Sequence, residues 1–197
     1  MGKHIDELIS RYPKLEGNKE SIVKSYDILV NCFEHDKKLL LCGNGGSSSD
    51  CDHIVGELMK GFCKKRTPQK KYSVDNLQDG LMAINLCAHI ALSHAFANDV
   101  NFEAQFANQV LNYGREGDVL LGITTSGNSK NVVCAAKVAK DKNMKVIALT
   151  GASGGSIKDI ADVSIIVPED ETYKIQELHL PIYHALCLEL EDRFFKE

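Results

Sequence analysis

Five short apolar segments alternate with longer segments of helical periodicity, and this alternation restricts the fold more than any other feature of the chain. The predicted strands are residues 38–42, 81–86, 118–124, 145–150 and 163–167. The predicted helices are residues 19–34, 47–61, 90–97, 102–112, 129–142 and 173–195. Apolar strands separated by helices are typical of a parallel sheet that is buried on both faces. We therefore predict an α/β fold, a three-layer α/β/α sandwich around a five-stranded parallel sheet.

No linker or low-complexity stretch divides the chain, and we predict a single domain over residues 1–197. Residues 1–36 are expected to form an N-terminal helical arm. A helical spacing of apolar residues near the start is interrupted at Pro13 and Gly17 before the pattern resumes at residue 19. Residues 64–80 are polar and irregular, which predicts an excursion between a helix and the second strand.

The net charge of the chain indicates which partners it can bind, and its cysteines indicate the redox state of the compartment in which it works. Lys and Arg total 23 against 27 Asp and Glu, a formal charge of −4, so nucleic acid is not expected as a partner. The first residues lack the apolar core of a signal peptide, and no apolar run is long enough for a membrane span, so no membrane association is expected. Seven cysteines without paired spacing indicate reduced thiols and a cytoplasmic protein.

Two predicted strands end in loops rich in glycine and hydroxyl side chains, GNGGSSS and TTSGNS, and a helix follows each loop. The carboxyl ends of parallel strands meet at one edge of a sheet, where open α/β folds bind their ligands. Amides at a helix start, together with nearby hydroxyls, can coordinate a phosphate. The hydroxyls concerned are those of Ser47, Thr124, Ser126 and Ser129. Helix capping is the alternative role, but two such loops favour phosphate binding. The chain has no GxxxxGK[ST] motif, which argues against a nucleoside triphosphatase.

His53 and Glu57 lie four residues apart, on one face of the helix predicted after the first loop. Such a pair alone is usually an ordinary hydrogen bond. The C-terminal helix adds Gln176 and His184, two turns apart and within about 80° of each other around the axis. A phosphate loop beside these groups indicates an enzyme with acid–base or metal chemistry. The same helix has an apolar side that should dock on this domain or on a neighbouring subunit, formed by Ile175, Leu178, Ile182, Leu186 and Leu190.

The motifs CGNGGSSSDCDH, GITTSGNSKNV, FANDV and IQELHLPIYHAL together resemble the sugar isomerase (SIS) domain family, most closely the branch that isomerises phosphorylated heptoses. The resemblance covers residues 22–195. It implies a Rossmann-like SIS fold and the aldose–ketose isomerisation of a sugar phosphate. The substrate it implies is sedoheptulose 7-phosphate, converted to D-glycero-D-manno-heptose 7-phosphate as a heptose precursor of surface carbohydrate.

The resemblance also implies roles for individual residues. A zinc ion, one per subunit, would be bound by His53, Glu57, Gln176 and His184. Glu57 would act as the base, with His184 as its acid–base partner; whether Glu57 serves both zinc and the substrate stays open. The sugar phosphate would contact Glu57, Gln176 and a set of loop residues. These loop residues are Asn44, Gly45, Gly46, Ser47, Asn98, Asp99, Thr124, Thr125, Ser126 and Ser129.

The sequence departs from the family pattern at Thr124, where serine is usual, and in the polar stretch 64–80. One alternative is a non-catalytic SIS protein that senses a sugar phosphate or binds a partner such as a replication initiator. The other is an isomerase of a pentose or hexose phosphate. The presence of both Glu57 and His184 favours the catalytic branch. A homotetramer with sites shared between subunits is predicted, because amphipathic helices exceed what one sheet needs and the family forms such assemblies.

Overall fold

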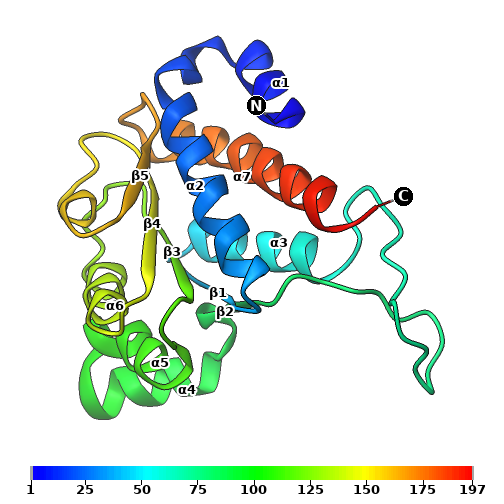
Figure 1. Ribbon diagram of the computed structural model, residues 1–197. Helices are drawn as coiled ribbons and strands as arrows, with labels where there is room; N and C mark the ends of the chain where they lie inside the picture. Colours follow the sequence, from blue (N-terminus) through cyan, green and yellow to red (C-terminus); the bar gives the residue numbers. More distant parts are fainter. Residues whose placement is uncertain (1, 197) are drawn as a thin grey trace.

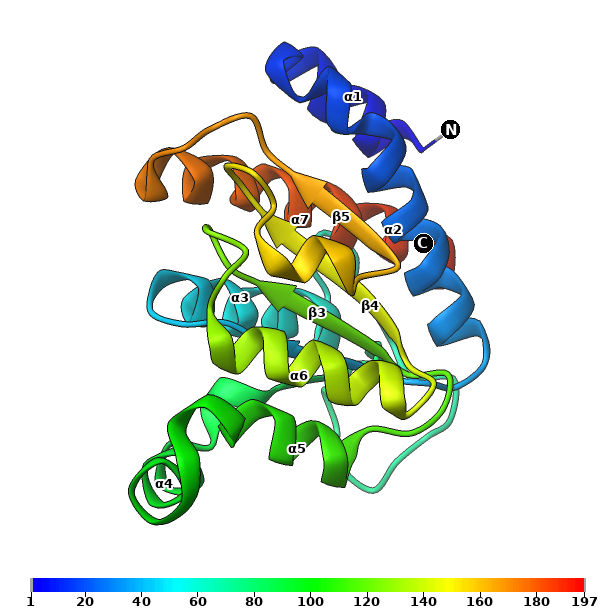
Figure 2. The same ribbon diagram turned by 90° about the vertical axis from the view of Figure 1, so that its left-hand side faces the viewer.

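The computed structural model describes residues 2–196, so Met1 and Glu197, the two ends of the predicted domain, lie outside the described residues. Within residues 2–196, five parallel strands form one sheet in the order β2-β1-β3-β4-β5 (Figures 1 and 2). The strands are β1 (Leu39–Cys42), β2 (Ala83–Asn85), β3 (Val119–Ile123), β4 (Lys145–Thr150) and β5 (Val163–Ile166). The predicted five-stranded parallel sheet is confirmed. Because β1 is paired with β3, the loops that leave their carboxyl ends are neighbours.

Helices cover both faces of the sheet, because the side chains of each strand alternate between the two faces. Leu39 and Leu41 pack into a core with one set of helices, whereas Leu40 and Cys42 pack into a second core on the opposite face. The first set is α1 (Lys3–Arg11), α2 (Lys19–Glu34), α3 (Gly46–Met59) and α7 (Thr172–Phe194). The second set is α5 (Gln105–Tyr113) and α6 (Lys130–Asp141). Figure 1 shows the sheet between these two layers, which confirms the predicted α/β/α sandwich.

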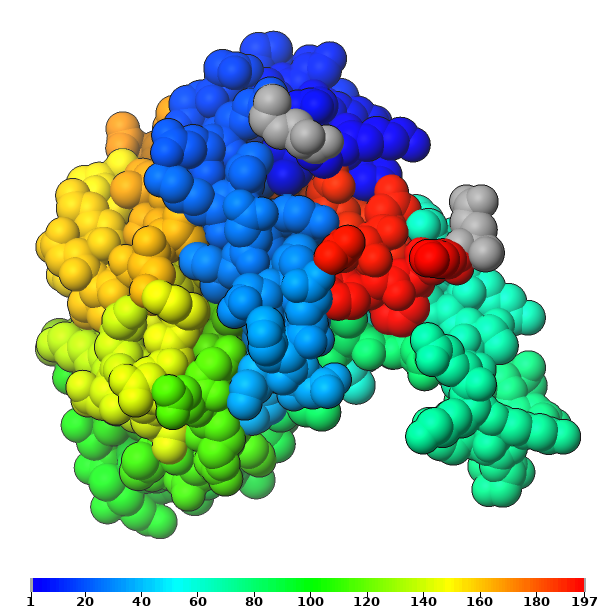
Figure 3. All heavy atoms as spheres, in the orientation of Figure 1, coloured from blue at the N-terminus to red at the C-terminus, as the bar shows by residue number. Residues whose placement is uncertain are grey.

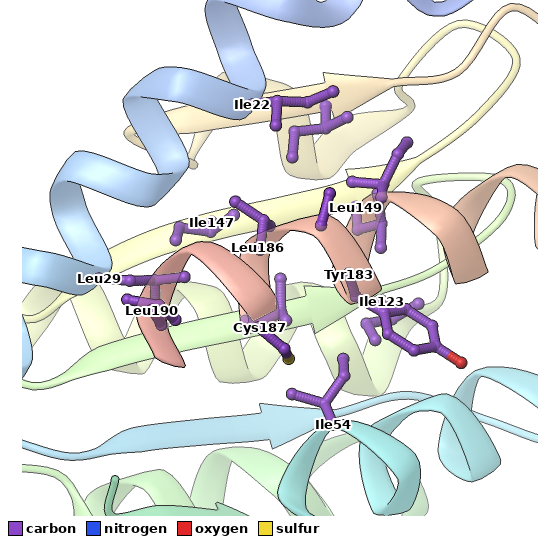
Figure 4. Packing of buried hydrophobic residues seen from close by; sticks show 14 of the residues in the cluster. Ile22, Leu29, Ile54, Ile123, Ile147, Leu149, Tyr183, Leu186, Cys187 and Leu190 are labelled. Atoms are coloured by element: carbon purple, nitrogen blue, oxygen red, sulfur yellow. The ribbon is translucent and has the colours of Figure 1, made fainter. Parts of the chain in front are cut away.

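The apolar side of α7 docks on its own domain, which decides between the two predicted partners for this helix. All five residues of the predicted stripe are buried in the core that α7 shares with α2, α3 and the sheet. Leu186 and Leu190 lie beside Leu29 of α2 and Ile147 of β4 (Figure 4). The expectation that surplus apolar faces pack against neighbouring subunits was therefore wrong for the α7 stripe, since its five residues are buried within one chain.

The structure shortens the predicted strand 81–86 and divides the predicted helix 102–112 into a 3₁₀ turn and an α-helix. Strand 81–86 shortens to β2, because the Asn85 side chain accepts the Cys87 N–H at 2.9 Å and starts a 3₁₀ turn there. Helices 90–97 and 102–112 are joined by tight turns, since the Asn101 side chain accepts the Glu103 N–H at 2.8 Å. The resulting series is α4 (Ile90–Phe96), a π-helical turn (Ala97–Asn101), a 3₁₀ turn (Phe102–Ala104) and α5. Hydrogen bonds from asparagine side chains thus set boundaries that hydrophobic periodicity does not report.

Residues 64–80 form an excursion, as predicted, and its outer part extends away from the body of the molecule (Figure 3). Its base is anchored by Arg66, which is 2% exposed. The Arg66 guanidinium donates to the carbonyls of Leu58 and Glu57 at the end of α3, at 2.6 and 2.9 Å. It also forms an ion pair of 2.9 Å with Glu191 of α7. The polar, irregular stretch 64–80 therefore contains a buried arginine that joins α3 to α7.

Candidate active site at the carboxyl edge of the sheet

The loops after β1 and β3 enclose a pocket of about 310 Å³ at the carboxyl edge of the sheet. Most of the residues predicted to contact a sugar phosphate line it. They are Asn44, Gly45, Gly46, Ser47, Thr124, Thr125, Ser129 and Gln176. The pocket lining does not include Ser126, whose hydroxyl accepts the Asn128 N–H at 3.2 Å in a local turn. The structure thus brings together most of this predicted set, from two loops and the start of α7.

Two of the three glycines in the first loop, Gly45 and Gly46, are needed for different steric reasons. Gly45 has a φ of +55°, a left-handed conformation that disfavours side chains with a Cβ atom. Gly46 begins α3 beneath Gln176, and a Cβ atom at this position would lie 2.5 Å from Gln176 Nε2. The N–H groups of Ser47 and Ser48 are engaged by the carbonyls of Asn44 and Gly45. Because these two amides are already hydrogen-bonded, the hydroxyl groups at the start of α3 are better placed than they are to donate to an anion.

The hydroxyls of the second loop do not act as simple helix caps. Ser129 precedes α6, yet within the described chain its hydroxyl makes no capping bond to that helix. It instead lies 2.9 Å from the Thr124 hydroxyl across the loop. Thr124 and Ser129 both line the pocket, and Thr124 is buried. The capping role considered from the sequence is therefore wrong for Ser129, and its hydroxyl faces a partner from the same loop.

A reciprocal pair of amides joins the first loop to α6. Asn44 Nδ2 donates to Asn131 Oδ1 at 3.0 Å, and Asn131 Nδ2 donates to Asn44 Oδ1 at 2.8 Å. Asn131 is buried, and its Oδ1 also accepts the Val132 N–H. Sequence reasoning did not identify Asn131, because an asparagine in the first turn of a helix is an ordinary residue there.

Two turns further along α3 and α7, three ionisable side chains meet. His53 Nε2 lies 3.3 Å from Glu57 Oε1 and 3.4 Å from His184 Nε2. Glu57 is largely buried, and its second oxygen has no hydrogen-bond partner among the described residues. The side chains predicted to meet between α3 and α7 therefore do so for these three residues. Gln176 lies at the other end of the site, against Gly46 in the loop pocket.

Burial and neighbouring charge set the protonation state of His184. Removal from water lowers the pKa of His184, and the adjacent His53 lowers it further, whereas Glu57 opposes the shift. The neutral imidazole is consequently favoured, and this form can accept a proton or bind a metal. Burial also raises the pKa of Asp50 and of Tyr183, two residues that lie beside His53 and that sequence reasoning missed. Asp50 lies one turn before His53, and this i, i+3 spacing was the available signal.

Among residues 2–196, no three His, Cys, Asp or Glu side chains are arranged as a complete metal site. The predicted ligands nevertheless have the right chemistry, with two imidazoles, a carboxylate and an amide. In a tetrahedral site with Zn–N bonds of about 2.0–2.1 Å, neighbouring ligand atoms lie about 3.3 Å apart. The two distances measured from His53 Nε2 match this spacing. His53, Glu57 and His184 fit zinc in donor type and in these two distances, whereas the predicted fourth ligand, Gln176, lies about two helical turns away in the loop pocket.

Asn98 and Asp99 are not in the pocket lining of their own chain. They lie on the π-helical turn after α4, where the Asn98 amide donates to the Asp99 carboxylate at 2.7 Å. The segment from α4 to the following 3₁₀ turn has no buried residue. Its exposed apolar side chains are Ile90, Leu92, Val100 and Phe102.

Comparison with known proteins shows which family shares this arrangement of loops and helices. The model of the SIS domain family matches residues 3–151, about three quarters of the chain. The chain belongs to the SIS domain family. This SIS domain is 42% identical over 180 residues to a phosphoheptose isomerase of Helicobacter pylori, covering 91% of this chain and 88% of the relative.

Solved structures show the same relationship. A phosphoheptose isomerase from Neisseria gonorrhoeae superposes with a TM-score of 0.80 at 36% identity, covering 96% of this SIS domain and 95% of that chain. A phosphoheptose isomerase from Francisella tularensis gives 0.79 at 34% identity, with 95% and 94% covered. The fold and family predicted from the motifs are therefore confirmed.

Proposed function

We propose that this SIS domain is an aldose–ketose isomerase that converts sedoheptulose 7-phosphate to D-glycero-D-manno-heptose 7-phosphate. The relatives named phosphoheptose isomerase support this, because they match most of the chain at 34–42% identity. The observation that carries the proposal is the meeting of one carboxylate and two imidazoles beside a hydroxyl-lined pocket. An enediol isomerisation requires a base, a proton carrier for the oxygens and a site that holds the phosphate.

The length of the site supports a seven-carbon substrate. His53 lies six residues after Ser47 on α3, and His184 lies eight residues after Gln176 on α7. At 1.5 Å per residue, about 9–12 Å separate the loop pocket from the ionisable cluster. An extended chain spans about 1.2 Å per bond, so the eight bonds from C1 to phosphorus in a heptose 7-phosphate span about 9–10 Å. A pentose 5-phosphate, with six such bonds, reaches only about 7 Å.

In the proposed mechanism Glu57 removes the proton from the carbon next to the carbonyl. The electron pair of that C–H bond forms the enediolate, and the proton returns to the neighbouring carbon. The second Glu57 oxygen suits this role, because among the described residues it has no hydrogen bond to give up and only a 3.9 Å ion pair with Lys60 Nζ. His184, favoured in its neutral form, transfers a proton between the two oxygens. Ser47, Thr124 and Ser129 hold the phosphate, so that remote binding energy orients the reacting carbons.

Zinc, one ion per subunit, would be bound by His53, Glu57 and His184. Gln176 lies in the loop pocket, about two helical turns from His184, so the predicted four-residue ligand set is not brought together within one chain. When bound, the ion would polarise the substrate carbonyl and stabilise the developing oxyanion. The two distances from His53 support His53, Glu57 and His184 as the ligands.

A homotetramer with active sites shared between subunits is part of the proposal. The segment with Asn98 and Asp99 supports it, because its exposed apolar side chains suit a contact with a second copy. Such a contact would bring these two residues to the pocket of a neighbouring subunit.

A cytoplasmic location is also proposed, with neither membrane nor nucleic acid as a partner. All seven cysteines are free thiols in the structure, which supports a reducing compartment. Among the described residues, no helix has both the length and the apolar character needed to cross a membrane.

Turnover of sugar phosphates with five, six and seven carbons would test the function. The heptose 7-phosphate should react with the highest kcat/KM, and the product formed in D2O should contain deuterium at the isomerised carbon. Faster reaction of a pentose or hexose phosphate would overturn the substrate. Binding of sugar phosphates without any turnover would instead support the non-catalytic alternative.

A further inference from the structure

The second ring nitrogen of His53 is held by a chain of polar groups that the mechanism above does not use. The Tyr183 hydroxyl lies 3.0 Å from His53 Nδ1 and donates to Asp50 Oδ1 at 3.2 Å. Asp50 and His53 are one turn apart on α3, whereas Tyr183 comes from α7. Three side chains from two helices are therefore connected in series.

The surroundings of Tyr183 fix where its hydroxyl points. The residue is 2% exposed, and its ring packs edge-on against the His53 ring with centroids 5.5 Å apart. Figure 4 shows the Tyr183 ring beside Ile123, with its hydroxyl directed out of the apolar cluster. A buried ring without freedom to turn away holds the hydroxyl between Asp50 and His53.

The hydrogen-bonding capacity of each group sets the tautomer of His53. A carboxylate can only accept, and a tyrosine hydroxyl has a single proton to donate. Because that proton goes to Asp50, the Tyr183 oxygen can only accept from the His53 ring. In its neutral form His53 therefore has its hydrogen on Nδ1 and a lone pair on Nε2. Nε2 is the atom that faces Glu57 and His184.

We infer that Asp50 and Tyr183 are positioning residues that keep His53 in the tautomer with an unprotonated Nε2. The effect of this tautomer on turnover rests on the proposed function. The lone pair on Nε2 is the group that would bind a metal ion or accept a hydrogen bond from a protonated His184. The opposite tautomer would place the hydrogen on Nε2, the atom that faces Glu57 and His184. Groups that orient a histidine through its far nitrogen typically change activity or metal affinity by about 10–100-fold when removed.

Two substitutions should act on the tautomer in different ways. Tyr183→Phe keeps the ring in the core but removes the acceptor for His53 Nδ1–H, so both tautomers should be populated. Asp50→Ala leaves the Tyr183 proton without its acceptor. The hydroxyl should then donate to His53 Nδ1, and the hydrogen of His53 should move to Nε2. Tyr26→Phe is the matched control, because Tyr26 also packs on this core from α2.

The experiment is ¹⁵N NMR of the histidine rings in the full-length, metal-free protein near pH 8, with His53 assigned by its loss in His53→Gln. The parent protein and Tyr26→Phe should show protonated Nδ1 and unprotonated Nε2. Tyr183→Phe should show mixed tautomers, and Asp50→Ala the opposite one. If Tyr183→Phe fails to fold, the reversal in Asp50→Ala is still decisive.

Activity supplies a second measurement. In both site variants kcat for the heptose phosphate should fall about 10–100-fold with KM changed less than threefold. A protonated Nε2 in the parent protein, or a kcat loss with an unchanged His53 tautomer, would overturn the inference. The NMR result does not depend on turnover, so it separates a failure of this inference from a failure of the proposed function.

Discussion

Asn44 and Asn131 exchange two hydrogen bonds, of 3.0 and 2.8 Å, between the loop after β1 and the first turn of α6. The two residues are 87 positions apart, and their amides fix the distance between the two hydroxyl-bearing loops. Two loops that bind the same phosphate need such a connection. Their hydroxyl groups can contact the phosphate oxygens together only when the two loops are held at a fixed distance from each other.

Asn131→Ala should weaken binding more than it slows the chemical step. It removes both bonds to Asn44 and leaves the Asn44 amide without partners, so the first loop is less well positioned. KM for the sugar phosphate should rise about tenfold, since each lost hydrogen bond is worth about 0.5–1.5 kcal/mol. Steady-state kinetics would measure this. Asn112→Ala, at an exposed position on α5, is the control; equal effects from both variants would contradict the prediction.

Glu57→Gln should abolish turnover and leave binding nearly intact, because the amide keeps the shape of the side chain but cannot accept the proton. A loss of kcat of about 10²–10⁴-fold is expected for removal of a general base. Isothermal titration with the sugar phosphate would check that binding is retained. Glu20→Gln, on the exposed side of α2, should behave as the parent protein. Retention of kcat within tenfold would exclude Glu57 as the base.

Arg66→Ala should destabilise the fold strongly although Arg66 lies in a polar, irregular segment. The substitution leaves the buried Glu191 carboxylate without its ion-pair partner and removes two bonds to the end of α3. Loss of one partner of a buried ion pair typically costs about 3–5 kcal/mol. Urea unfolding of the variant would measure the change. Lys65→Ala, at the exposed neighbouring position, should alter stability by less than about 0.5 kcal/mol.

The same ion pair predicts acid sensitivity. Burial alone would raise the pKa of Glu191, but the N–H groups of Cys63 and Phe62, together with Arg66, bring it below its ordinary value. A group with a lowered pKa stabilises the fold fully above its unfolded pKa, about 4.3 for glutamate. That contribution should be lost as the pH falls from about 4.3 through the lower, folded pKa. Unfolding followed between pH 3 and pH 7 should show this loss for the parent protein and a smaller one for Glu191→Gln.

Val100→Asp should disrupt assembly and activity together. Val100 is 68% exposed and lies next to Asp99 on the segment proposed to contact a second copy. A charge there would oppose burial in an apolar contact, and the sites completed across it would be lost. Light scattering and kinetics on the same samples would test this, with Leu111→Asp on the exposed side of α5 as control. A fully active monomer in either protein would refute shared sites.

Sequence alone determined the fold class and the positions of the two loops and of the His53–Glu57 pair, because these depend on local regularities. Apolar strands between helices require a sheet covered on both faces, and glycine and hydroxyl loops after two such strands must share one edge. The i, i+4 spacing of His53 and Glu57 places them on one helical face, and the structure shows them 3.3 Å apart.

Only the tertiary structure decided the contacts made between distant segments. No local pattern reveals the partner of Asn44, the burial of Arg66 in a polar, irregular stretch, or the link from Tyr183 to His53. The apolar side of α7 could equally have served a neighbouring subunit until its burial in its own core was seen. The physical reason is that periodicity states which face of an element is apolar, whereas the partner of that face is set by how all the elements pack together.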